Sequence, residues 1–184
     1  TSTLVVARHP RAIELCDQEL KAKLANRAVS PAMIKVIAEV AGAQIAKPQA
    51  QALITAMLDH PAAAVRQAAW RVIGGQTGAV SHADWLPRLE AALKAAAAGG
   101  GGDLTLVLDA IAKQPVKHFA AALQALSNDR NRPMPVRLRA LGAATRPGEP
   151  LGAESYALLF DLAKGDGSPT ARVSIQPAPG AHWL

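Results

Sequence analysis

The chain has 184 residues, enough for one globular domain or for several stacked units of a helical-repeat array. Half of the residues are hydrophobic but only 3% are aromatic. A core of Ala, Leu, Val and Ile suits closely packed helices better than a β-sandwich, which draws on aromatic and β-branched residues. The formal net charge of +6 permits attraction to polyanions, but the basic residues are scattered and do not by themselves indicate a nucleic-acid site.

The cysteine and hydropathy patterns exclude further classes of protein. A single cysteine, Cys16, rules out an internal disulfide and a cysteine-rich zinc module. No uncharged apolar run approaches the roughly 18 residues of a transmembrane helix, and residues 1–8 lack the pattern of a secretory signal peptide. Because the chain begins with Thr1, we expect it to be processed or excerpted from a longer protein.

Apolar residues at helical spacing predict five helices in the first half of the chain. These helices cover residues 11–24, 31–42, 48–58, 61–74 and 83–97. The fourth has the clearest apolar stripe, which comprises Val65, Ala68, Ala69, Val72 and Ile73. We expect Asp59 or His60 to cap this helix, with Pro61 in its first turn and Gly74 at its end.

The second half continues this pattern after a helix-breaking run of glycines at 99–102. Helices are predicted at residues 103–112, 116–126, 135–144 and 152–164, and one more is expected to begin near Asp166. No segment alternates apolar and polar residues for long enough to predict a strand. The chain is therefore predicted to be all-α, with roughly ten short helices.

A degenerate repeat relates the second helix of each predicted pair. A turn and a proline precede an aliphatic residue, a basic residue and small residues, with the basic residue at Lys35, Arg66, Arg137 and Arg172. These positions are 31, 71 and 35 residues apart, and 71 is two periods of about 35. Paired helices at this period predict an α-solenoid whose neighbouring pairs share one core. The predicted repeats of this single domain are 8–45, 46–76, 82–113, 115–146 and 151–176, followed by an irregular tail at 177–184.

The repeat resembles the HEAT repeat, in which an Asp-containing turn precedes a helix with Pro, Val-Arg, Ala and Gly. The best match comprises Asp59, Pro61, Val65, Arg66, Ala69 and Gly74. The resemblance covers nearly the whole chain and implies a right-handed α-solenoid of about five HEAT-like helix pairs. It also implies that the arginines pair with turn aspartates, for which Asp59, Asp129 and Asp166 are available. The alanine-rich, proline-punctuated style further resembles solenoid segments of large bacterial multidomain proteins.

One group on the helix predicted at 61–74 is a candidate binding site. It comprises Arg66, Gln67, Trp70 and Arg71. Trp70 lies off the apolar stripe, and an exposed Trp beside Arg is a usual interface anchor. Alternatively, Trp70 fills the gap to the adjacent repeat, and the sequence leaves both interpretations open.

The remaining reactive side chains form no recognisable catalytic or metal site. The histidines are dispersed, and no two have the three- or four-residue spacing that is usual for metal ligands on a helix. We expect His60 and His82 to be solvated in turns. Cys16 lies on an apolar helical face, which indicates a small buried hydrophobic residue rather than a nucleophile. We therefore predict no catalytic residue, no metal ligand and no cofactor.

These patterns favour a non-catalytic binding scaffold that uses the inner face of a solenoid for protein–protein interaction. Two alternatives stay open: a nucleic-acid-binding solenoid resembling the HEAT-like alkylpurine DNA glycosylases, and a weak hydrolase with a site between repeats. The last helix runs into Pro177 and Pro179 and is too short to cap an array. We expect the apolar stripe of the helix at 152–164 to be covered by the tail or, in a homodimer, by a second copy.

Overall fold

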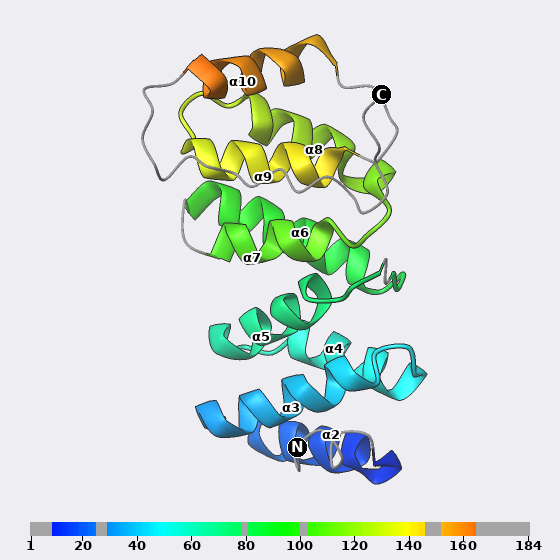
Figure 1. Cartoon of the computed structure of the whole chain (residues 1–184). Helices are drawn as coiled ribbons and strands as arrows, with labels where there is room; N and C mark the ends of the chain where they lie inside the picture. Colours follow the sequence, from blue (N-terminus) through cyan, green and yellow to red (C-terminus); the bar gives the residue numbers. More distant parts are fainter. Residues whose placement is uncertain (1–8, 25–28, 79–80, 100–102, 146–151, 165–184) are drawn as a thin grey trace. The chain divides into compact units, whose positions relative to one another are not determined.

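The computed structural model describes residues 9–24, 29–78, 81–99, 103–145 and 152–164 (Figure 1). Within these ranges the chain forms nine α-helices and no strand, which confirms the predicted all-α class. The helices are α2 (Pro10–Leu24), α3 (Pro31–Ala43), α4 (Pro48–Leu58), α5 (Ala63–Gly74), α6 (Trp85–Gly99), α7 (Asp103–Ile111), α8 (Val116–Asn128), α9 (Met134–Ala144) and α10 (Ala153–Lys164). The helix expected to begin near Asp166 lies outside the described residues.

The chain divides into two compact units, residues 1–149 and 150–184. Helices α2 to α9 belong to the first unit and α10 to the second. The first four predicted repeats correspond to the helix pairs α2/α3, α4/α5, α6/α7 and α8/α9. The arrangement of all five repeats as one domain stays a prediction.

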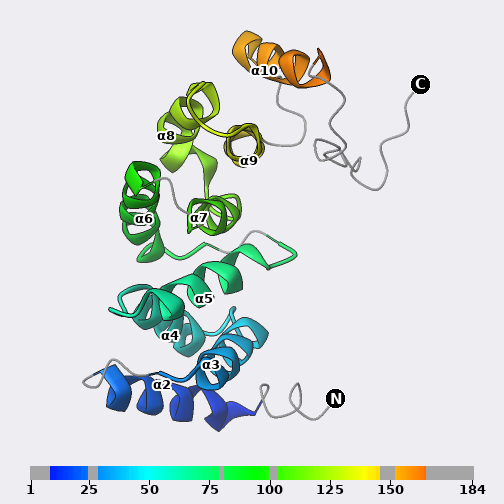
Figure 2. The same cartoon turned by 90° about the vertical axis from the view of Figure 1, so that its left-hand side faces the viewer.

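In the first unit, each helix contacts its sequence neighbour or the next helix but one. One series comprises contacts of α3 with α5, α5 with α7 and α7 with α9, and the other comprises contacts of α2 with α4, α4 with α6 and α6 with α8. Contacts within each predicted pair, such as those of α4 with α5, join the two series (Figure 2). One cluster of buried apolar side chains extends from α2 to α9, so these helices share a continuous core.

The predicted apolar stripe of α5 contributes to this core as expected. Val65, Ala68, Ala69 and Ile73 are buried, and Val72 is half-buried against the same cluster. Periodicity missed Trp85, the first residue of α6, which is fully buried. Its indole Nε1 donates to Oγ1 of Thr55 at 3.1 Å, so this side chain links α6 to α4.

The start of α5 differs from the prediction. Ala62 is its N-cap residue, without a side-chain capping bond, so the cap predicted from Asp59 or His60 is wrong and Pro61 precedes the helix. Both candidate caps are engaged elsewhere. The Asp59 carboxylate accepts two hydrogen bonds from Arg88, and His60 Nδ1 accepts the N–H of Ala62 at 3.0 Å. The turn therefore packs into the protein instead of capping the helix.

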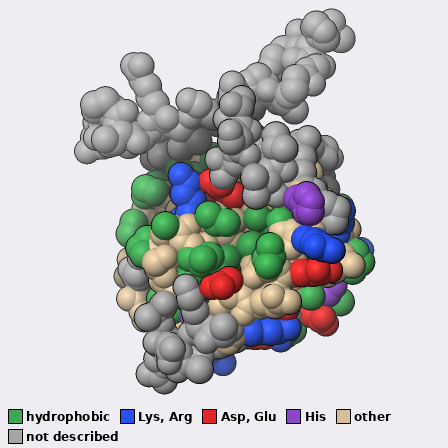
Figure 3. Space-filling model, turned by 90° about the horizontal axis from the view of Figure 1, so that it is seen from below, with side chains coloured by type: hydrophobic (Ala, Val, Ile, Leu, Met, Phe, Trp, Pro, Cys, Tyr) green, Lys and Arg blue, Asp and Glu red, His purple; other side chains and the backbone are tan. Residues whose placement is uncertain are grey.

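A few large apolar side chains remain at the surface. Leu15 of α2 and Val36 of α3 are exposed, and Figure 3 shows apolar side chains among charged ones at this end of the first unit. Tyr156 and Phe160, four residues apart on α10, are also exposed. None of the helices in the described ranges is long and apolar enough to cross a membrane.

Candidate binding groove

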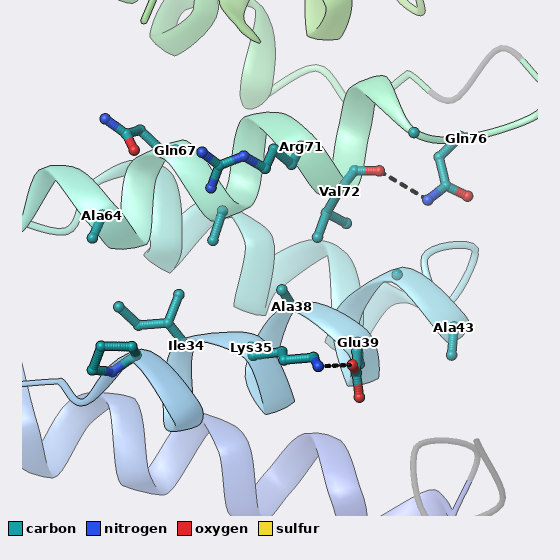
Figure 4. Close-up of a pocket in the computed structure, with 14 residues that line it drawn as sticks. Ile34, Lys35, Ala38, Glu39, Ala43, Ala64, Gln67, Arg71, Val72 and Gln76 are labelled. Carbon is teal, nitrogen blue, oxygen red and sulfur yellow. Dashed lines mark hydrogen bonds and ion pairs between the residues drawn. The ribbon is translucent and has the colours of Figure 1, made fainter. Parts of the chain in front are cut away.

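A groove with a volume of about 740 Å³ lies between α3 and α5. Figure 4 shows the two helices side by side, with Ile34 and Ala64 near one end of the groove and Ala43 and Gln76 near the other. The lining residues fall between positions 31 and 43 on one wall and between 64 and 76 on the other. The α3–α5 groove therefore follows each helix for about three turns.

The floor of the groove is apolar because both helices present small or aliphatic residues to it. Ile34, Ala38 and Val72 are half-buried and pack against the core. A Cβ atom added at Gly42 would lie 3.6 Å from Cγ1 of Val72, which is an ordinary van der Waals distance. The other apolar lining residues are Pro31, Ala43, Ala64, Ala68 and Gly75. Residues of this size leave the space between the helices unfilled.

Helix α5 packs far more closely on α7 than on α3. A Cβ atom added at Gly74 would lie 3.0 Å from Cβ of Asp109 and 3.2 Å from the backbone N of Ala110. These distances are shorter than almost all real Cβ contacts, so a side chain at this position would push the two helices apart by a few tenths of an ångström. The same helix is thus closed against one neighbour and open toward the other.

The α3 rim of the groove carries an exposed ion pair. Nζ of Lys35 lies 4.0 Å from a carboxylate oxygen of Glu39, and the Lys35 side chain is 78% exposed. At the far end, Nε2 of Gln76 donates to the carbonyl of Val72 at 2.9 Å. An ion pair this long and this exposed stabilises little, so Lys35 and Glu39 can readily exchange partners.

The α5 rim carries Gln67 and Arg71, one helical turn apart. Nε2 of Gln67 donates to Oδ1 of Asp103 at 2.6 Å, which ties this side chain to α7. Arg71 is exposed and lines the groove, and within the described ranges its guanidinium has no hydrogen bond or ion pair (Figure 4). Arg71 therefore offers the groove a full positive charge and its whole set of N–H donors.

The structure divides the four predicted site residues between two places. Gln67 and Arg71 line the α3–α5 groove, whereas Arg66 and Trp70 line a second cavity of about 450 Å³ near α6. Trp70 is only 7% exposed, so of its two interpretations the structure matches the one in which it fills a gap between helices. The prediction left out the α3 wall, including Lys35, because all four predicted site residues were chosen from a single helix.

Charged side chains around the second cavity are already paired within the protein. Arg66 donates from one guanidinium nitrogen to the carbonyls of His60 and Pro61, at 2.8 and 2.7 Å. Arg88 donates to both carboxylate oxygens of Asp59, at 2.7 and 2.6 Å, and this hydrogen bonding raises the pKa of Arg88. The second cavity thus has little unsatisfied charge to offer a ligand.

The prediction that the repeat arginines pair with turn aspartates is wrong for Arg66 and Arg137. Arg66 and Arg137 donate to backbone carbonyls, the latter to that of Ser127 at 2.9 Å. Asp129 instead accepts the Asn131 N–H and the side chain of Arg132, and these bonds lower its pKa. The arginines still stabilise the segment before their helix, because the charged guanidinium donates charge-assisted hydrogen bonds to carbonyls there. Arg172 and Asp166 lie outside the described residues.

His60 and Cys16 are both buried, which was expected for the cysteine but not for the histidine. His60 was expected to be solvated but is only 1% exposed, because the turn packs into the core. Burial and the nearby Arg66 lower the pKa of His60, whose Nε2 is buried without a partner. Cys16 is buried as expected, and burial raises the pKa of its thiol. Across the described ranges, no three His, Cys, Asp or Glu side chains group closely enough to hold a metal ion.

Comparisons of this chain with protein-family models, with curated proteins and with solved structures gave no match. The resemblance to HEAT repeats therefore stays a prediction from sequence.

Proposed function

We propose that the chain is a non-catalytic binding module, a right-handed α-solenoid of HEAT-like pairs that holds a partner protein in the α3–α5 groove. The order of the helix contacts supports the architecture. The first predicted pair packs on the second, the second on the third and the third on the fourth, each time through equivalent helices, first with first and second with second. This pattern is typical of arrays in which every unit contacts only its neighbours.

Hydrogen bonds from side chains of one predicted helix pair to residues of the adjacent pair support the same architecture. Arg88 binds Asp59 across 29 positions, and Nε of Arg139 binds Oδ1 of Asp109 across 30 positions at 2.7 Å. Other such bonds span 30, 35 and 36 positions. These separations are close to the period of about 35 residues in the sequence repeat, as expected when equivalent surfaces of successive helix pairs face each other.

The observation that carries the proposed function is the open groove whose rim carries Arg71, an exposed arginine with no partner in the part of the chain that the structure describes. Interfaces combine an apolar centre with a polar rim, and arginine is enriched among the residues that dominate binding energy. The groove has this composition, with Ile34, Ala38 and Val72 in its floor and Arg71 above them. An unpaired positive charge on a chain of net charge +6 favours a partner segment that carries carboxylates.

No observation favours either alternative function. The nucleic-acid interpretation drew on Trp70, Arg66, Arg71 and the net charge of +6. Arg66 donates to two backbone carbonyls and Trp70 is buried, so of these three side chains Arg71 is the exposed one.

Groove-filling substitutions test the proposed function. A phage-displayed library of random peptides of about 16 residues, longer than the groove, would be selected on the intact chain. We expect binders whose affinity falls at least about tenfold when Ala64→Trp or Ala43→Trp fills either end of the groove. Both alanines are exposed, so neither substitution should unfold the protein.

Ala63→Trp is the matched control for this experiment, because Ala63 is exposed on the same helix but lines neither cavity. It should leave peptide affinity unchanged. Binders that tolerate both groove-filling substitutions, or a library that yields no binder, would contradict the proposed function.

A further inference from the structure

The α3–α5 groove is elongated along the helix axes. On the α3 wall the lining residues recur in every turn from Pro31 to Ala43, the whole length of that helix. Twelve residue steps in a helix rise about 18 Å, so the groove extends for about that length. An elongated groove between two neighbouring helices suits a polypeptide segment better than a compact small molecule.

The spacing of the lining residues matches that of a third helix. Along α3, Ile34, Ala38 and Gly42 are one turn apart, and Ala64, Ala68 and Val72 repeat this spacing along α5. Residues four apart on a helix lie about 6 Å apart along its axis, a spacing that a helical partner reproduces, whereas side chains on one face of an extended strand recur about every 6.8 Å. A helical segment therefore stays in register with both walls along the whole groove.

Backbone hydrogen bonding also favours a helix in this groove. An extended segment of about 18 Å has some five residues, whose N–H and C=O groups would need partners. The floor offers only apolar side chains, and the rim side chains of Gln67 and Gln76 already donate to Asp103 and to the carbonyl of Val72. A helix satisfies its own backbone groups, so it can enter an apolar groove without that cost.

The charges on the rim indicate what the polar edge of such a helix carries. Arg71 is exposed and unpaired within the described residues, and Lys35 on the opposite wall is held only by a 4.0 Å contact with Glu39. Among the described residues, the groove rim therefore has one net positive charge without an ion-pair partner. A carboxylate on the bound segment would form a charge-assisted hydrogen bond with the Arg71 guanidinium.

We infer that the α3–α5 groove binds an amphipathic α-helix of a partner protein, with aliphatic residues on the groove floor and an Asp or Glu at Arg71. This inference rests on the proposed function and specifies the partner that the groove takes. Leu, Ile, Val or Ala at positions i, i+4 and i+7 of the helix would contact Ile34, Ala38 and Val72.

The peptide with the highest affinity from the library selection tests this inference when it is synthesised and titrated by fluorescence anisotropy. A proline at its centre should weaken binding by at least about tenfold, because proline breaks a helix. Arg71→Glu should weaken binding by roughly tenfold, and replacing the acidic residue of the peptide with Lys should restore most of that loss on the Arg71→Glu protein.

Arg130→Glu supplies the matched charge control. The substitution changes the net charge by the same amount as Arg71→Glu, and Arg130 is exposed and lies outside the groove. It should change affinity by less than about twofold. A peptide that Ala64→Trp blocks, but that tolerates the central proline or Arg71→Glu, would overturn the helix inference and leave the proposed function standing. A peptide that tolerates both Ala64→Trp and Ala43→Trp would overturn the helix inference and the proposed function together.

Discussion

Helix α5 meets two neighbours in opposite ways. Toward α7, Gly74 lets the backbones approach so closely that a Cβ atom would lie 3.0 Å from Asp109. Toward α3, a Cβ atom at Gly42 would lie at an ordinary 3.6 Å from Val72, and a groove of about 740 Å³ runs along the contact between the two helices. The apolar surface buried on the first side stabilises the fold. The surface left open on the second side remains available for a partner.

The two arginines of α5 show the same contrast in charge. Arg66 is half-buried and bound to two backbone carbonyls, whereas Arg71, five residues later, is exposed and unpaired in the described part of the chain. Residues with an internal partner contribute to stability, and residues without one remain available for binding. Both residues are arginines, so residue type does not determine which of them is bound internally. Their surroundings in the folded protein do.

The largest effect is expected from a charge in the core that both sides of α5 share. Val65 is 1% exposed, so Val65→Asp would bury a carboxylate without a partner. We expect a loss of about 3–5 kcal/mol in the free energy of unfolding, measured by urea denaturation. Ala64→Asp is the control, because the adjacent Ala64 is exposed in the groove and should tolerate the charge. Equal losses for the two variants would show that the apolar stripe is misassigned.

Gly74 and Gly42 test the close contact of α5 with α7 and its open contact with α3, respectively. Gly74→Val should force α7 away from α5 and cost about 1–3 kcal/mol of unfolding free energy. Gly42→Ala places a methyl group within a helix at an ordinary van der Waals distance from Val72, so it should be neutral or stabilise the protein by up to about 1 kcal/mol. Urea midpoints of the two variants would contradict the comparison if they shifted in the same direction by similar amounts.

The fold was predictable where a residue's role depends on its own helix. The stripe of α5 followed from a spacing that places Val65, Ala69 and Ile73 on one face, and all three are buried. Trp85 was missed because it is the first residue of α6, where a periodic pattern has barely begun. The turn containing His60 was expected to face solvent because turns usually do, and its burial depends on packing between helices.

The candidate site was only partly predictable for the same reason. Gln67 and Arg71 were selected as part of a polar cluster on one helix, and both line the groove. The opposite wall, with Ile34 and Lys35, lies about 30 residues earlier in the chain and became apparent only when α3 was found beside α5. Whether Trp70 was an anchor or a gap filler depended on the neighbouring helices, which the sequence does not specify.

A smaller effect should separate the two arginines. Arg66→Met removes the hydrogen bonds to the carbonyls of His60 and Pro61 and should cost about 1–2 kcal/mol of unfolding free energy. Arg71→Met removes no internal contact and should stay within about 0.5 kcal/mol of the parent protein. The pair is matched in residue type, helix and substitution. If Arg71→Met proved the more destabilising of the two, the assignment of Arg71 to binding would be wrong.

The smallest effect is expected from pH, through His60. Its Nδ1 accepts the N–H of Ala62, so a proton at that nitrogen would replace an acceptor with a donor that faces another donor. Burial and Arg66 lower the pKa of His60 in the folded protein. The unfolded chain therefore binds this proton first as pH falls below about 6.5, and the free energy of unfolding decreases from there toward the lower folded pKa. Above that window His60 is neutral in both states and the effect vanishes.

Asparagine is the informative replacement for His60, because its side-chain oxygen can accept the same Ala62 N–H without binding a proton. We expect His60→Asn to flatten the decline in urea midpoint between about pH 7.5 and about pH 5, whatever its effect at neutral pH. His118→Asn is the control, since this exposed histidine lies 3.3 Å from Glu90 and gains an ion-pair partner when protonated. If the urea midpoint of His60→Asn still fell as the pH decreased, another group would be responsible. The turn before α5 would then not be the acid-sensitive part of the protein.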